Sequence, residues 1–100
     1  MPVLSISLRI YYNKGFSLNL VERYEEALMA YDRAIQLDPT YAYAYNNKGL
    51  TLNNMNKHES AIRYFDYAIK LKPDFLEAVN KKQNNFEIIL LFNLMVHIFK

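Results

Sequence analysis

Two stretches of this chain repeat one another. The residues from Tyr11 to Pro39 read YYNKGFSLNLVERYEEALMAYDRAIQLDP, and those from Tyr45 to Pro73 read YNNKGLTLNNMNKHESAIRYFDYAIKLKP. The shift that carries Gly15 onto Gly49 aligns the two copies along their whole length. Self-similarity at a fixed period of about 34 residues is typical of a solenoid built from stacked supersecondary units. The chain is therefore expected to fold as repeated units rather than around one irregular core.

The aligned positions keep their chemical type from one copy to the next. The pairs that serve as structural landmarks are Tyr11 and Tyr45, Gly15 and Gly49, Ala27 and Ala61, Tyr31 and Phe65, Ala34 and Ala68, and Pro39 and Pro73. A glycine inside a helix costs about 1 kcal/mol relative to alanine, so its recurrence predicts a close approach of two helices. We expect Ala27 and Ala61 to face the glycines, and Tyr31 and Phe65 to fill the space beside them.

Helical spacing of apolar residues predicts five helices. The first is placed at about residues 8–20, and the second has Glu25 and Glu26 in its first turn and ends before Pro39. The others are placed at about 41–54, 58–71 and 75–98, with turns at 21–22 and 55–57. Thr40 is expected to cap the third helix, and Asp74 with Glu77 to form a capping box at the fifth.

These landmarks resemble those of the tetratricopeptide repeat family. The resemblance rests on two registered copies, and it covers residues 11–73 well and 74–86 in part. It implies an all-α, antiparallel helix-pair solenoid with two full repeats and a long C-terminal helix. It assigns residues 8–41 to the first repeat, 42–75 to the second, and 76–100 to a partial third repeat or hydrophobic C-terminal helix. Residues 1–7 are an N-terminal extension or the remnant of a repeat.

Composition argues against several other classes of protein. The formal net charge of +2 is too balanced to indicate a nucleic-acid partner, and the absence of cysteine excludes disulfides and thiolate chemistry. His58 and His97 have no metal-ligand spacing, and the recurrence of Asp32 and Asp66 at the repeat period favours a structural role. No catalytic or phosphate-binding motif occurs. We expect no cofactor, no enzymatic activity and a cytoplasmic location, since residues 1–8 also lack the basic start of a signal peptide.

The resemblance also implies a binding surface. In this family the first helix of each pair lines a concave groove, and the corresponding inward positions include Arg9, Leu20 and Glu77. The remaining inward positions are the candidate peptide-binding residues: Tyr12, Phe16, Asn19, Tyr43, Asn46, Leu50, Asn53, Asn54, Asn80 and Asn84. Asparagine amides pair with an extended peptide backbone, and aromatic rings supply apolar area at low entropic cost. The alternative is that these are solvated positions in an asparagine-rich chain, with Asn13 and Asn47 as local hydrogen-bonding residues.

One subclass of the family binds the C-terminal carboxylate of chaperones through a clamp of Lys, Asn and Arg side chains. This sequence fits that clamp poorly. Tyr12 and Phe16 replace its first Lys and Asn, and Glu77 stands where a Lys is expected, although Asn47 and Lys81 match. A glutamate facing an anionic ligand repels it. We therefore predict that chaperone tails are not the ligand.

The last part of the fifth helix, residues 86–99 (FEIILLFNLMVHIF), is apolar on most faces and must be covered by something. It is too short for a transmembrane helix and is interrupted by Glu87, Asn93 and His97. Two interpretations of this segment remain, an intramolecular cap and an association surface, and we favour the association surface. Two full units bury little area, so self-association through residues 86–99, or instability as a monomer, is expected.

The sequence thus predicts a non-catalytic protein–protein interaction module, a scaffold or adaptor that presents a short concave groove to a peptide or helix. Two alternatives remain. The chain could be a truncated or degenerate repeat fragment whose tail has no binding role. It could also be a peripheral membrane-associated adaptor that uses the apolar tail, although membrane contact is the less favoured of these.

Overall fold

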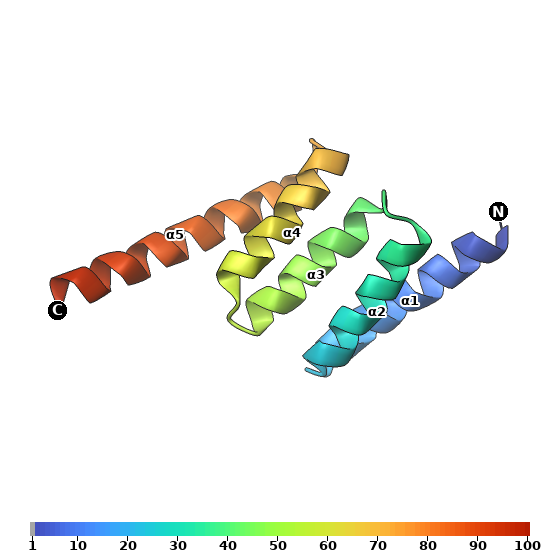
Figure 1. Cartoon of the computed structure of the whole chain (residues 1–100), viewed down its shortest axis with the longest axis horizontal. Helices are drawn as coiled ribbons and strands as arrows, with labels where there is room; N and C mark the ends of the chain where they lie inside the picture. Colours follow the sequence, from blue (N-terminus) through green and yellow to red (C-terminus); the bar gives the residue numbers. More distant parts are fainter. Residues whose placement is uncertain (1) are drawn as a thin grey trace.

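The computed structural model describes the backbone of residues 2–100 and the side chains of residues 5–100. Within them the chain forms five α-helices and no strand: α1 (Pro2–Leu20), α2 (Tyr24–Leu37), α3 (Ala42–Asn54), α4 (His58–Leu71) and α5 (Leu76–Ile98). Helix α2 folds back on α1, and α4 folds back on α3, so that the chain advances as antiparallel pairs (Figure 1). This arrangement confirms the all-α helix-pair solenoid.

Helix α1 is longer than the sequence predicted. Residues 2–7, which were expected to be an extension or a repeat remnant, continue the helix that was placed at 8–20. No helix breaker stands between Val3 and Tyr11, and proline is accepted in the first turn because the amide it lacks has no intrahelical partner there. Met1 lies outside the described residues.

The turns inside the two pairs are copies of each other. Glu22 and Asn56, which occupy the same position of the repeat, both adopt a left-handed backbone conformation, with φ of 64° and 61°. The amide of Arg23 bonds to the carbonyl of Leu18 at 2.9 Å, and that of Lys57 bonds to Leu52 at 2.8 Å. These are the bonds of a Schellman motif, which satisfies carbonyls at a helix end. Each turn therefore reverses the chain tightly and sets the second helix against the first.

The links between pairs correct two capping predictions. Thr40 does not cap α3; its hydroxyl and amide both donate to Oδ1 of Asp38, at 2.6 and 3.0 Å, and Tyr41 takes the N-cap position without a side-chain cap. Asp74 does not cap α5 either, because it accepts from Lys72 at 3.2 Å and Phe75 is the N-cap residue. In both links an aromatic residue that packs inward replaces the expected polar cap.

The repeated glycines admit aromatic rings from the second helix of each pair. A Cβ placed on Gly15 would lie 2.6 Å from Cε1 of Tyr31, and one placed on Gly49 would lie 2.6 Å from Cε1 of Phe65. Both distances are far inside van der Waals contact. These contacts confirm that Tyr31 and Phe65 fill the space beside the glycines. Ala27 and Ala61 are fully buried, and their expected contact with the glycines stays a prediction.

Ion pairs and hydrogen bonds join successive pairs. Asp32 on α2 contacts Lys48 on α3 at 2.5 Å, and at the equivalent positions Asp66 on α4 contacts Lys82 on α5 at 2.6 Å. This places the recurring aspartates in structural roles. Half-exposed ion pairs contribute little stability, on the order of 0–1 kcal/mol each, so they fix the register of the pairs more than they hold them together.

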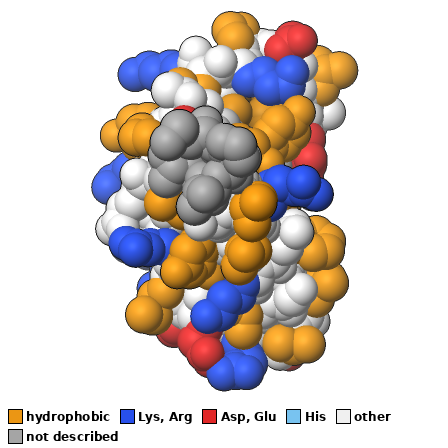
Figure 2. All heavy atoms as spheres, turned by 90° about the vertical axis from the view of Figure 1, so that its right-hand side faces the viewer, with side chains coloured by type: hydrophobic (Ala, Val, Ile, Leu, Met, Phe, Trp, Pro, Cys, Tyr) orange, Lys and Arg blue, Asp and Glu red, His pale blue; other side chains and the backbone are white. Residues whose placement is uncertain are grey.

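Helix α5 packs on α4 with its first half and extends beyond it with its second (Figure 1). The molecule is correspondingly elongated, with extents of 56 × 29 × 17 Å. None of the helices in the described part of the chain has the length and apolar character needed to cross a membrane. At the opposite end, formed by α1 and α2, hydrophobic side chains are interspersed with Lys and Arg rather than gathered in one patch (Figure 2).

Candidate functional site

The candidate groove residues differ in how far they reach solvent. Phe16 is 50% exposed and Tyr43 is 44% exposed, and Asn54, Asn80 and Asn84 are also exposed. The half-buried members are Tyr12, Asn19, Leu50 and Asn53. Asn46 is buried, with 1% of its surface exposed. A ligand on this face would therefore meet aromatic and amide side chains from α1, α3 and α5, but not Asn46.

A continuous row of aromatic rings crosses this face. The ring centroids of Tyr12 and Tyr41 are 5.3 Å apart, those of Tyr41 and Tyr43 are 5.5 Å apart, and those of Tyr43 and Phe75 are 5.1 Å apart. At its inner end Tyr12 lies 6.0 Å from the buried ring of Tyr31. Tilted and edge-on rings at these separations attract one another and hold each other rigid. The row links α1, α3 and the start of α5 into one firm surface.

The row is uncharged at neutral pH and has charges near it. Burial, followed by the proximity of Tyr41, raises the pKa of Tyr12, and burial followed by Tyr43 raises the pKa of Tyr41. Both hydroxyls therefore stay protonated and can donate or accept hydrogen bonds. Glu77 also acts to raise the pKa of Tyr12, while Arg9 lowers and Asp38 raises the pKa of Tyr41, so these charged groups lie within electrostatic range of the row.

Several asparagines are already engaged within the protein. Asn54 donates to Asn19 at 3.0 Å, which pairs two groove candidates with each other across α1 and α3. Asn47 donates to the hydroxyl of Tyr12 at 2.9 Å, a structural role as expected, whereas its counterpart Asn13 is exposed. Asn53 Oδ1 accepts from Asn85 at 2.7 Å. These bonds orient the face and leave its exposed asparagines, Asn80 and Asn84, as the freer amides.

Sequence reasoning missed three residues that shape this face. Tyr41 and Phe75, which complete the aromatic row, stand at equivalent positions of the repeat just before α3 and α5, so the repeat alignment carried a signal that could have found them. The third is Asn85, which is 1% exposed and donates to both Asn53 and the backbone carbonyl of His58. Nothing in the sequence distinguishes it from its exposed neighbour Asn84.

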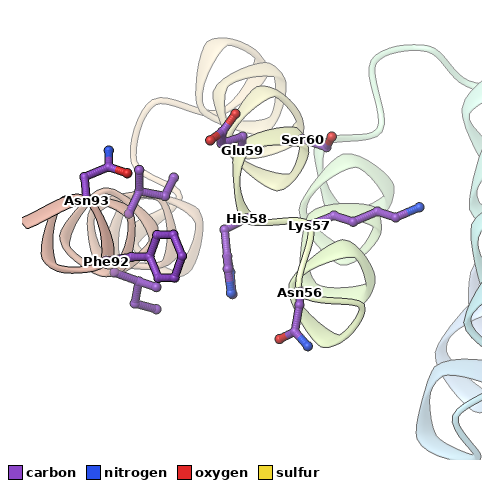
Figure 3. A pocket seen from close by; sticks show the side chains of 9 residues that line it. Asn56, Lys57, His58, Glu59, Ser60, Phe92 and Asn93 are labelled. Atoms are coloured by element: carbon purple, nitrogen blue, oxygen red, sulfur yellow. The ribbon is translucent and has the colours of Figure 1, made fainter. Parts of the chain in front are cut away.

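A hollow of about 650 Å³ lies between the start of α4 and the second half of α5. His58 on α4 and Phe92 on α5 face one another across it, while Lys57 points away from α5 (Figure 3). The Nδ1 atom of His58 lies 3.2 Å from Asn53 Oδ1. The described residues contain no group of three or more His, Asp or Glu side chains that could hold a metal ion. The hollow has the mixed lining of a space between two helices rather than an arrangement of acid and base groups.

Two family models match the chain. The model described as a TPR repeat matches residues 22–56, and the model described as a tetratricopeptide repeat matches residues 42–75. Together with the repeated helix pairs they decide the family. The chain belongs to the tetratricopeptide repeat family. This tetratricopeptide repeat protein gave no significant match in a comparison with curated protein sequences.

Solved structures share the fold. A crystal structure of MamA superposes with a TM-score of 0.81 at 30% sequence identity, over 92% of this chain and 54% of MamA. The second TPR of Spaghetti (RPAP3), bound to the HSP90 peptide SRMEEVD, superposes with a TM-score of 0.82 at 19% identity, over 93% of this chain and 88% of that one. The second TPR domain of human RPAP3, in complex with the HSP70 peptide SGPTIEEVD, gives 0.74 at 24% identity, over 78% and 65%.

The chain spans about half of the length of the MamA structures it matches, 54% and 50%. The RPAP3 domains are less than 25% identical to it, so their likeness supports the fold alone.

Proposed function

We propose that this protein is a non-catalytic interaction module that binds a linear peptide segment on the face formed by α1, α3 and α5. The observation that carries the proposal is the row of packed rings from Tyr12 through Tyr41 and Tyr43 to Phe75, in which Tyr43 is exposed and the buried Phe75 supports it from below. Aromatic side chains give a large contact area and lose little conformational entropy on binding, which is why they are enriched where proteins recognise one another.

The charges near the row argue for an uncharged or basic peptide. Tetratricopeptide repeat domains of RPAP3 were solved with the acidic peptides SRMEEVD and SGPTIEEVD bound. Here the exposed Glu77 lies within electrostatic range of Tyr12, and its negative charge would repel an acidic peptide on this face. Tyr12 itself is committed to Asn47 and to the aromatic row. The ligand that fits is a segment with apolar or aromatic residues and little negative charge.

A displayed library of short linear peptides tests the proposal. Selected peptides are expected to be depleted of Asp and Glu, and binding should weaken by about tenfold or more in a Tyr12→Ala/Tyr43→Ala variant, since loss of central aromatic contacts costs about 2 kcal/mol or more. The matched control is Tyr67→Ala on α4, which removes a tyrosine that is 52% exposed and also packs against other rings, but lies away from this face.

Three results would overturn the proposal. They are a library that yields no binder, an equal loss of affinity in the Tyr67→Ala control, and selection of acidic sequences such as SRMEEVD over their scrambled versions. A cytoplasmic location and the absence of enzymatic activity remain predictions that accompany this function.

A further inference from the structure

One face of α5 lacks the helix that its position in the repeat calls for. The shift that carries Gly15 onto Gly49, applied once more, carries Gly49 and Leu52 of α3 onto Gln83 and Phe86 of α5. In α3 this face packs on α4: Phe65 lies over Gly49, and Leu52 is only 6% exposed. In α5 the equivalent Phe86 is 52% exposed. The described residues thus contain the first helix of a third unit without a second helix to cover it.

A groove marks the uncovered place. It has a volume of about 420 Å³ and lies between Ile69 of α4 and α5, where the apolar stripe of Val79, Phe86 and Leu90 is flanked by the polar residues Lys82, Gln83 and Glu87. Beyond the start of α4, which faces Phe92, α5 continues to Ile98 and projects from the rest of the described chain (Figure 1). The same apolar stripe therefore starts in the groove and runs onto the projecting part of the helix.

Gln83 argues against a further helix of the usual kind in this groove. In both complete units the equivalent residue is glycine, and the ring of the second helix lies so close that even a Cβ would clash, at 2.6 Å. The longer side chain of Gln83 keeps an incoming helix farther away. A helix in this groove would therefore lie at an ordinary helix–helix distance of about 8–10 Å, without a ring seated over position 83.

The projecting part of α5 is such a helix. Its residues from Phe86 to Phe99 include ten exposed large apolar side chains, with exposed fractions of 46–83%. A run of exposed large apolar side chains on one segment is typical of an association surface, whereas exposed apolar residues on a monomer are normally scattered singly. Glu87 is the only Asp, Glu, Lys or Arg in this segment, so two copies of it would not repel each other strongly.

We propose that two copies of this chain associate through α5. The projecting half of α5 from each copy lies antiparallel in the groove of the other, in the place of the missing second helix. A two-fold axis between the helices then brings Phe86 of one copy next to Leu90 of the partner subunit, and Leu90 of the first next to Phe86 of the partner subunit. Such an isologous contact closes on itself and yields a dimer rather than a filament. The contact centres on Phe86 and Leu90, whereas the aromatic row is formed by Tyr12, Tyr41, Tyr43 and Phe75, so the two proposals rest on different residues and are tested separately.

Sedimentation equilibrium of the full chain tests the proposal. The wild type is expected to show twice the 11.9 kDa mass of one chain at micromolar concentration. Leu90→Glu should raise the dissociation constant by about a hundredfold or more, because the dimer would bury two unpaired carboxylates. Met29→Glu is the matched control, since Met29 is 70% exposed on α2 and Leu90 is 69% exposed on α5; its dissociation constant should change by less than about threefold.

Cysteine pairing tests the same contact in a way that does not depend on a charged substitution. The chain has no cysteine, so a mixture of Phe86→Cys and Leu90→Cys chains should form mixed disulfide dimers under mild oxidation, and Met29→Cys chains should not. A wild type that is monomeric at all concentrations, that forms larger or open-ended assemblies, or that binds neutral phosphatidylcholine vesicles as a monomer would overturn the proposal. So would equal cross-linking by the Met29→Cys control.

Discussion

At the scale of single residues, the contact between a glycine and an aromatic ring explains why both residue types recur at fixed positions of the repeat. Gly15 and Gly49 keep the helical conformation, so they are required for space and not for backbone freedom. The rings of Tyr31 and Phe65 are 1% and 0% exposed. Burying a ring of this size stabilises the fold by about 2–3 kcal/mol, which outweighs the ~1 kcal/mol that a glycine costs inside a helix.

Gly49→Ala should therefore destabilise the protein, although alanine is the better helix former. Overpacking against a buried ring costs about 1–3 kcal/mol, and the gain in helix propensity offsets roughly 1 kcal/mol of it. We expect a net loss of up to about 2 kcal/mol in the free energy of unfolding, measured with urea.

Gln83→Ala is the control for that substitution, because it changes the equivalent position of α5, where no ring lies. It should change the free energy of unfolding by less than about 0.5 kcal/mol. Adding Phe65→Leu to Gly49→Ala should make the glycine substitution less costly than it is alone. A stabilising Gly49→Ala would contradict the packing described here.

Tyr31 carries a hydroxyl group that Phe65 lacks, and this difference predicts a pH dependence of the free energy of unfolding. Burial raises the pKa of Tyr31 from 10.0 to about 12, with a smaller opposing contribution from a hydrogen bond with Asn47. The unfolded chain therefore releases this proton first, and the stability contributed by neutral Tyr31 is complete below pH 10.0 and lost as the pH rises to about 12. The loss amounts to about 2–3 kcal/mol.

Tyr31→Phe should remove this part of the alkaline destabilisation, since Phe65 shows that the site accepts a phenyl ring. The free energy of unfolding, followed from neutral pH to about pH 12, should fall less steeply in the variant than in the wild type. Tyr12, Tyr41 and Tyr45, whose pKa values burial also raises, contribute to the slope that remains, together with Lys48, whose pKa is raised as well. Identical slopes would show that Tyr31 ionises in the folded protein as readily as in the unfolded one.

At the scale of helices, the sequence predicted the helix boundaries that the repeat period controls. The ends of α3, α4 and α5 lie within one residue of their expected positions, because Pro39, Pro73 and the two turns leave little choice. The predicted N-caps were wrong, because the N-cap depends on the direction of the backbone before the helix as well as on the residue type. Tyr41 and Phe75 turn inward to join a row of rings, and this leaves Thr40 and Asp74 to bond within the links.

The attachment of α5 depends on a residue that no pattern marked. Asn85 is buried and spans from α5 to Asn53 on α3 and to the His58 carbonyl at the start of α4. Asn85→Ala should lower the free energy of unfolding by about 1–3 kcal/mol, because it removes two hydrogen bonds that a buried side chain makes to α3 and α4. It should also raise amide hydrogen exchange throughout the first half of α5.

Asn84→Ala changes the adjacent, exposed residue and serves as the control. Its effect should stay within about 0.5 kcal/mol. If both variants were equally stable, the hydrogen bonds of Asn85 would not hold α5 in place.

At the scale of the whole molecule, the repeat register predicted which residues form the groove face, but not which of their side chains are buried or hydrogen-bonded. It placed Tyr12 and Tyr43 among the groove residues, and the structure joins them through Tyr41. It also included Asn46, which is buried, and Asn53, which is engaged by Asn85. Burial and hydrogen bonding depend on contacts between units, and a one-dimensional register does not contain those contacts.

The binding of a peptide to the face of α1, α3 and α5 is tested most directly by backbone amide NMR of the protein during titration with a peptide selected from the library. The account predicts that the largest shift changes occur around Tyr12, Tyr43 and Asn80. Changes confined to the outer surfaces of α2 and α4, around Arg33 and Arg63, would contradict it.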